Sequence, residues 1–73
     1  MKTATIERYH IFGTCQHERH VLYRGRHIGA RNQGYFPDDL QGLESAKQWA
    51  RAHGFTHYAT VNNGKEYGKR GAL

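Results

Sequence analysis

The sequence predicts one small α+β domain over residues 1–73, in which a single helix covers one face of an antiparallel sheet. Three observations predict this fold: the short length, several β-rich segments, and one stretch with helical spacing of apolar residues. A chain of 73 residues has room for one thin core and no deep substrate cavity. Aromatic residues make up 12% of the chain, which is enough to seed such a core, so extensive disorder is not expected.

Strands are expected in the order β-β-β-α-β, with a possible short fifth strand. Residues 3–12 are rich in Thr, Ile, Tyr and Phe with imperfect alternation, which is typical of a strand. Residues 21–31 hold two apolar runs around Arg24-Gly25-Arg26, the pattern of a hairpin that turns at a glycine. Residues 32–37 contain a glycine and a proline and are expected to form a loop.

One amphipathic helix is predicted over Leu40–His53. Its apolar arc at helical spacing consists of Leu43, Ala46, Trp49, Ala50 and His53. Asp38 or Asp39 can cap its start, because a carboxylate accepts from the unpaired N–H groups of the first turn. Gly54 is a natural stop, whereas Gly42 weakens the first turn.

The segment after the helix is expected to form the last strand, over residues 55–61. Asn63-Gly64 is a strong hairpin signal, so Glu66-Tyr67 is predicted to fold back as a short edge strand. Residues 68–73 are expected to be a loose basic tail. The predicted core consists of Ile6, Ile11, Val21, Ile28, Leu43, Ala46, Trp49, Ala50, Phe55 and Val61.

Positive charge is concentrated in the first half of the chain. The chain has 11 Lys and Arg against 6 Asp and Glu, a formal charge of +5. Residues 1–36 hold six of these basic residues against two acidic ones, while residues 37–64 hold two against three. The predicted sheet, and not the helix, therefore carries the positive charge. Arginine predominates there, and its planar fork fits phosphate or carboxylate.

The first functional hypothesis is a non-catalytic module that binds nucleic acid through an Arg-rich hairpin. A two-stranded ribbon can enter a major groove, and Tyr rings can stack on unpaired bases. The alternative explanation of the same charge is a solvated surface that maintains solubility. The candidate binding residues are Arg19, Tyr23, Arg24, Arg26, His27, Arg31, Tyr35, Lys69 and Arg70.

Two further hypotheses remain open. The chain has the size and texture of phage or mobile-element accessory proteins, some of which bind and inhibit a host protein complex. In that case, Tyr and Arg side chains would anchor the contact, and the sheet edges could also support a homodimer. The last hypothesis is a small RNA-cleaving toxin, for which the right residue types are His17, His20, His27, Tyr23 and Arg24.

The cysteine and histidine residues indicate which cofactor and which cellular compartment to expect. No cofactor is expected, although Cys15, His17 and His20 are zinc-ligand types within six positions, and His10 or His27 could join them. Their spacing matches no regular zinc pattern. A lone cysteine excludes an internal disulfide and indicates a reducing cytoplasm. No apolar run is long enough to span a membrane, and Met1–Gly13 does not resemble a secretory signal.

Overall fold

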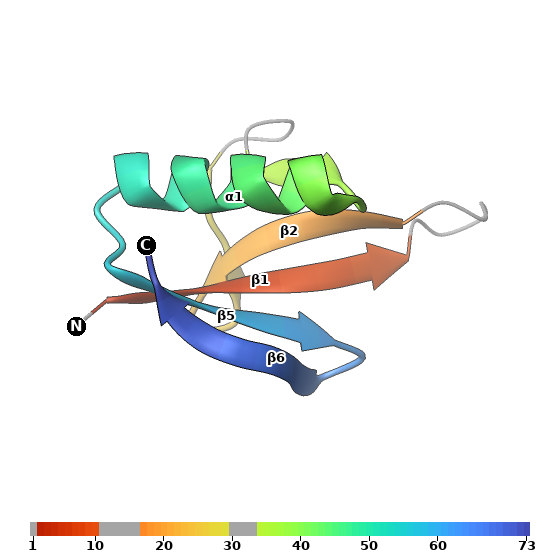
Figure 1. The fold of residues 1–73 in the computed structure, drawn as a ribbon. Coiled ribbons are helices and arrows are strands. Elements are labelled where there is room, and N and C mark those ends of the chain that lie inside the picture. Colours follow the sequence, from red (N-terminus) through yellow and green to blue (C-terminus); the bar gives the residue numbers. More distant parts are fainter. Residues whose placement is uncertain (1, 11–16, 30–33) are drawn as a thin grey trace.

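A sheet of six strands and one helix form the fold in the computed structural model, which describes residues 2–10, 17–29 and 34–73 (Figure 1). Helix α1 spans Leu40–Ala52. The strands are β1 (Thr3–His10), β2 (His17–Tyr23), β3 (Arg26–His27), β4 (Tyr35–Pro37), β5 (His57–Asn62) and β6 (Lys65–Ala72). The prediction of a small α+β fold with one helix is confirmed, whereas the strand order differs in part.

The sheet is mostly antiparallel, as predicted, but it contains one parallel pair that the prediction did not include. Its order is β3-β2-β1-β5-β6, with β4 pairing the same edge of β2 as β3 does. All pairs are antiparallel except β1–β5. Two antiparallel steps make β4 parallel to β1, and the helix then carries the chain back before β5 begins. A 13-residue helix is about 20 Å long, which returns the chain to the starting end of the sheet and makes β5 parallel to β1.

Both predicted hairpins are present, and each turns through two residues with positive φ. Arg24 and Gly25 have φ of 54° and 77°, and Asn63 and Gly64 have φ of 53° and 78°. Positive φ at both central residues defines the turn type whose twist matches paired strands. The turns place Tyr23 opposite Arg26 and Asn62 opposite Lys65.

The helix begins and ends close to where the sequence predicts. Asp39 is the cap, and its Oδ1 accepts a hydrogen bond from the Gly42 amide at 2.6 Å. The first turn also packs tightly on β4, because a Cβ at Gly42 would lie 1.8 Å from the Pro37 carbonyl oxygen. A glycine is therefore required there despite its low helix propensity. No helix in the described parts of the chain is long and apolar enough to cross a membrane.

The core lies between α1 and the β1–β2 half of the sheet (Figure 1). Its buried residues are Ala4, Ile6, Val21, Ala46, Ala50 and Phe55, and its partly buried neighbours include Ile28, Leu43 and Trp49. Of the predicted core, Val61 is only partly buried outside this cluster, and Ile11 lies outside the described residues. Strand alternation places Ala4 and Ile6 on one face of β1, which the imperfect sequence pattern did not resolve.

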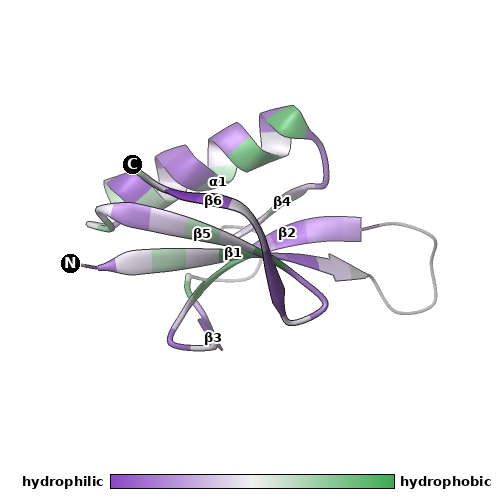
Figure 2. Cartoon of the chain, turned by 60° about the horizontal axis from the view of Figure 1, so that its bottom comes forward, coloured by the Kyte–Doolittle hydropathy of each residue, from purple (hydrophilic) through white to green (hydrophobic). Residues whose placement is uncertain are grey.

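Two segments differ from the sequence prediction. Residues 35–37 form strand β4 instead of a loop, because β2 offers them an unpaired edge at Glu18–His20. Residues 68–72, expected to belong to a loose tail, continue β6 along β5. Figure 2 shows that β6 is mostly hydrophilic, so its extended conformation rests on backbone pairing and not on an apolar face.

Candidate functional site

The basic residues divide into those with a carboxylate partner and those without one. Four have an acidic partner within 4.0 Å: Arg8 and Arg19 share Asp38, Lys47 meets Glu44, and Arg70 meets Glu66. No ion pair among the described residues involves Lys2, Arg24, Arg26, Arg51, Lys65 or Lys69. Only the second group carries charge that no neighbouring carboxylate offsets.

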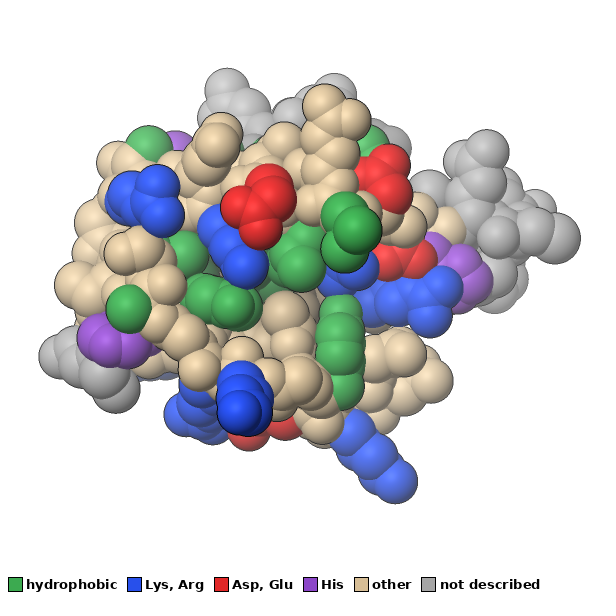
Figure 3. Space-filling view, viewed as in Figure 1, with side chains coloured by type: hydrophobic (Ala, Val, Ile, Leu, Met, Phe, Trp, Pro, Cys, Tyr) green, Lys and Arg blue, Asp and Glu red, His purple; other side chains and the backbone are tan. Residues whose placement is uncertain are grey.

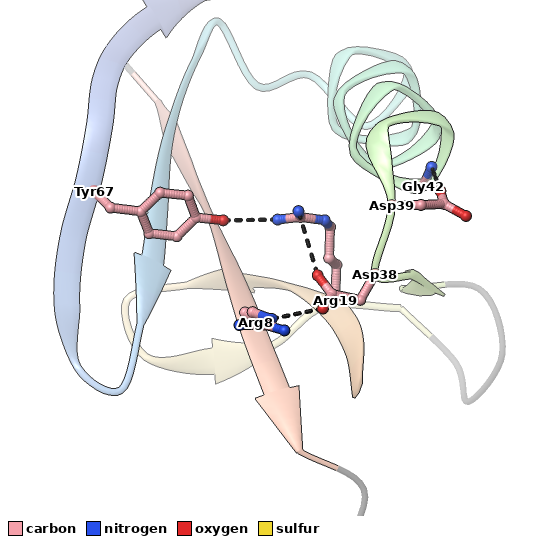
Figure 4. A network of polar contacts seen from close by, with 6 residues as sticks. All are labelled: Arg8, Arg19, Asp38, Asp39, Gly42 and Tyr67. Atoms are coloured by element: carbon pink, nitrogen blue, oxygen red, sulfur yellow. Dashed lines mark hydrogen bonds and ion pairs between the residues drawn. The ribbon is translucent and has the colours of Figure 1, made fainter. Parts of the chain in front are cut away.

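Arg19, a predicted binding residue, is instead part of an internal network (Figure 4). Its Nη1 donates to the Tyr67 hydroxyl at 2.7 Å, and its Nη2 lies 3.3 Å from Asp38 Oδ1. Asp38 Oδ2 accepts from Arg8 Nε at 2.6 Å. The Arg19 side chain is only 11% exposed. The network thereby joins β1, β2, β6 and the segment before the helix.

Cationic side chains lie close to the Tyr23 ring at the tip of the β2–β3 hairpin. The Tyr23 ring lies edge-on to Phe55, with ring centroids 5.4 Å apart. Lys2 Nζ lies 5.3 Å and the Arg24 guanidinium carbon 5.1 Å from the Tyr23 ring centroid. Arg26 stands opposite Tyr23 in the hairpin and is exposed, as are Lys2 and Arg24. We call Lys2, Tyr23, Arg24 and Arg26 the hairpin end.

Lys2 was not among the residues predicted from the sequence. Its place beside Tyr23 depends on the β1–β2 register, in which Thr5 pairs with Leu22 and Ile6 with Val21. That register follows from putting Ile6 and Val21 on the helix-covered face. The positions of the apolar residues in the two strands could have predicted this register, and with it the place of Lys2.

Two other predicted basic residues lie at the opposite edge of the sheet. Lys69 and Arg70 belong to β6, whereas the hairpin end flanks β3, and three strands separate these edges. Arg70 donates two hydrogen bonds to Glu66, which lower the pKa of that carboxyl group. Figure 3 shows basic side chains in separate groups on the face it displays. The predicted residues therefore do not form one continuous surface.

A cluster of four rings lies on the sheet face opposite the helix, and we call it the His/Tyr cluster. It consists of Tyr9, His20, His27 and Tyr35. Their centroids lie 4.1 Å (His20–Tyr35), 4.5 Å (Tyr9–His20), 4.8 Å (His20–His27) and 5.7 Å (His27–Tyr35) apart. The three other rings leave His20 only 3% exposed. The sequence predicts no element that covers this face, yet the rings cover its β2 portion.

The environment of His20 favours its neutral form. Burial lowers the pKa of His20, as does the neighbouring His27, while Glu18 acts in the opposite direction. His20 Nε2 lies 3.2 Å from Glu18 Oε1, and His20 Nδ1 lies 3.2 Å from His27 Nδ1. Both ring nitrogens of a nearly buried histidine thus have partners on the protein.

Of the predicted zinc and RNA-cleavage residues, His20 and His27 lie side by side, whereas His17 and Tyr23 lie on the other face of the sheet. His17 shares a strand face with Arg19 and Val21, whereas His20 lies on the opposite face. Tyr23 lies on the helix-covered face, away from His20 and His27. Within the described ranges, no group of three or more His, Cys, Asp or Glu side chains is placed to hold a metal ion. Cys15 and Arg31 lie outside the described residues.

One shallow pocket of about 250 Å³ lies where the starts of β1 and β5 meet the end of β6. Its lining includes Thr3, His57, Tyr58 and Arg70. It carries neither the rings of the His/Tyr cluster nor the cations of the hairpin end. Comparison of the chain with known protein families, curated protein sequences and solved structures returned no match.

Proposed function

We propose that this protein binds nucleic acid through the hairpin end. The observation that carries the proposal is the position of Lys2 and Arg24 over the Tyr23 ring, with Arg26 opposite Tyr23 in the hairpin. Among the described residues, none of these three cations has a carboxylate partner. Affinity for a phosphate backbone depends on such uncompensated charges. The planar Arg side chains can also donate two hydrogen bonds to a phosphate or a guanine edge.

The backbone of Arg24 supports the same proposal. Arg24 is exposed and has φ of 54°, a left-handed conformation that costs an ordinary L-residue roughly 1–2 kcal/mol. The other hairpin has Asn63 at the equivalent position, and asparagine is favoured there. An exposed arginine therefore occupies a position where asparagine would make a better turn. A binding role for its guanidinium accounts for that choice.

Fluorescence anisotropy with labelled single-stranded RNA, single-stranded DNA and duplex DNA tests the proposal at several salt concentrations. The key variant is Arg24→Gln/Arg26→Gln, and the matched control is Lys65→Gln/Lys69→Gln. Both double variants remove two positive charges from exposed positions, but at opposite edges of the sheet. The comparison therefore separates a local site from the effect of net charge.

The proposal expects binding in ~150 mM salt and a selective loss in the hairpin variant. Each phosphate contact contributes about 0.9 to the salt slope for duplex DNA and about 0.7 for single strands. Removing two contacts should lower the slope by about 1.8 for duplex DNA and about 1.4 for single strands, while the β6 control stays close to the parent. Equal losses in both variants, or no binding to any probe, would overturn the proposal. Shortened RNA on a gel would instead favour the cleavage hypothesis.

A second candidate function is binding to another protein, such as a host complex that it inhibits. The observation that favours it is the presence of exposed large apolar side chains on the helix and on the edge strand β6. Leu40 at the helix start is 83% exposed, and Tyr67 on β6 is 39% exposed. Leu40→Ser should weaken a protein contact there and leave nucleic-acid binding unchanged.

A further inference from the structure

The two histidines of the β2–β3 hairpin point their Nδ1 atoms at one another. His27 pairs with Leu22 across the hairpin, and His20 precedes Leu22 on the same face, so the two imidazoles are diagonal neighbours. Their Nδ1 atoms lie 3.2 Å apart. This is the long end of the range for an N–H···N hydrogen bond.

Glu18 determines which nitrogen of His20 carries the proton. Its Oε1 lies 3.2 Å from His20 Nε2, and a carboxylate can only accept, so Nε2–H is the donor. The Nδ1 atom of neutral His20 then has a free lone pair directed at His27. A carboxylate that holds the distal N–H of a histidine is the usual support for a metal-ligating imidazole.

The spacing also suits two nitrogens bound to one metal ion. Metal–nitrogen bonds of about 2.0–2.1 Å place two nitrogens about 2.9 Å apart at a right angle and about 3.3 Å apart at the tetrahedral angle. The observed 3.2 Å falls within these limits. When His27 carries its proton on Nε2, both Nδ1 atoms present a lone pair at this spacing.

The surroundings favour a cation. His27 is exposed whereas His20 is nearly buried, so His27 forms the solvent side of the pair. The carboxylates of Glu18 and Glu7 both act on His20 through their charge. Arg26 is adjacent to His27 along β3 but lies on the opposite face of the strand.

We propose that His20 and His27 form a two-histidine binding site for a divalent transition-metal ion that prefers imidazole nitrogen, with Glu18 as the residue that positions His20. Cu²⁺ and Zn²⁺ have this preference. Two protein ligands leave the other coordination positions to water. The site lies on the opposite sheet face from the Tyr23 ring, so it does not depend on the proposed nucleic-acid function.

Calorimetric titration with Zn²⁺ and electron paramagnetic resonance with Cu²⁺ test the site. All variants carry Cys15→Ser, which removes thiol chemistry. We expect one equivalent of ion with micromolar affinity and two nitrogen ligands in the Cu²⁺ spectrum. His27→Gln should weaken binding at least ~10-fold and remove one nitrogen from the spectrum. Glu18→Gln should weaken it by roughly 10–100-fold, as the loss of an orienting partner typically does, and leave both nitrogens bound.

The control is His53→Gln, because His53 is an exposed histidine at the end of α1. It should bind the ion like the parent. His27→Gln is the decisive variant, since an exposed side chain can be replaced without disturbing the core. Unchanged affinity in His27→Gln, or loss of binding in Cys15→Ser alone, would show that other residues hold the ion and would overturn the proposal.

Discussion

Arg19 in strand β2 and Arg24 in the turn that follows it differ in their exposure to solvent. Arg19 is held between Asp38 and Tyr67 and is nearly buried, whereas Arg24 is exposed beside Tyr23. The sequence predicts a binding role for both arginines, because no neighbouring residue in the sequence distinguishes them. Asp38 and Tyr67 are distant along the chain, and only the folded sheet brings them to Arg19. Burial and partners, more than residue type, therefore decide which arginines can meet a ligand.

Arg19→Ala should destabilise the fold. The substitution removes the hydrogen bond to Tyr67 and the ion pair with Asp38. Hydrogen bonds to charged groups contribute about 1.5–3 kcal/mol each, so we expect a loss of about 2–3 kcal/mol in the free energy of unfolding, measured with urea. Arg8→Ala should cost less, since the Arg8 side chain is 38% exposed. An Arg19→Ala variant as stable as the parent would mean that the network in Figure 4 is not structural.

Arg24→Asn should change stability and binding in opposite directions. Asparagine tolerates φ of 54° better than arginine does, so the variant should gain roughly 0.5–1 kcal/mol, a part of the left-handed cost. The same substitution removes one phosphate contact and should lower the salt slope of nucleic-acid binding by about one unit. Urea unfolding and anisotropy measure the two effects separately. A variant that gains stability and keeps its affinity would show that Arg24 does not touch the ligand.

At the level of elements, the sequence predicts those helices and turns whose formation depends on residues close together in the chain. The helix over Leu40–Ala52 and the turns at Arg24-Gly25 and Asn63-Gly64 follow from caps, spacing and turn chemistry within a few residues. The parallel β1–β5 pair does not, because it depends on the direction in which the helix returns the chain. The three residues of β4 are also too few to show a strand pattern. Predicting the hairpin end requires both the local turn signal and the pairing of distant strands, since Lys2 lies beside Tyr23 only because of the β1–β2 register.

Gly42→Ala should destabilise the protein, although alanine is the better helix former. Propensity alone predicts a gain of about 1 kcal/mol. The added Cβ would instead lie 1.8 Å from the Pro37 carbonyl oxygen, so β4 and the first helical turn would have to separate. Overpacking of this kind costs typically about 1–3 kcal/mol, and we expect a lower melting temperature by calorimetry. Gln48→Ala, at an exposed position of the same helix, is the control and should be neutral or slightly stabilising.

For the whole molecule, the two faces of the sheet serve different purposes. The face toward α1 holds the apolar core and the Arg8–Asp38–Arg19 network. The other face buries the His20 ring among Tyr9, His27 and Tyr35. A small core leaves little stability in reserve, so an ionisable group within the second layer should make folding depend on pH. The proposed contact with nucleic acid lies at the hairpin end, at the margin of the helix-covered face, where Tyr23 packs against Phe55.

The stability of the metal-free protein should therefore fall as the pH drops from 7.5 to 5.5. Burial and His27 hold the pKa of His20 below its ordinary value of 6.5 in the folded state. The unfolded chain binds this proton first, so the stabilisation is fully present above about pH 6.5 and is lost as the pH falls toward the folded pKa. One proton corresponds to a limiting slope of about 1.4 kcal/mol per pH unit. Urea unfolding with a chelator present measures that slope.

The change of stability with pH, and not the stability at one pH, shows whether His20 is the titrating group. His20→Gln can weaken the fold by disturbing the rings around it, but it should flatten the pH dependence because the titrating group is gone. His53→Gln should retain the slope, since His53 is exposed at the helix end. Within the described part of the chain, the charged groups that act on His20 apart from His27 are the carboxylates of Glu18 and Glu7, and carboxylates ordinarily titrate below this window. A parent slope that persists in His20→Gln would therefore show that a group other than His20 titrates.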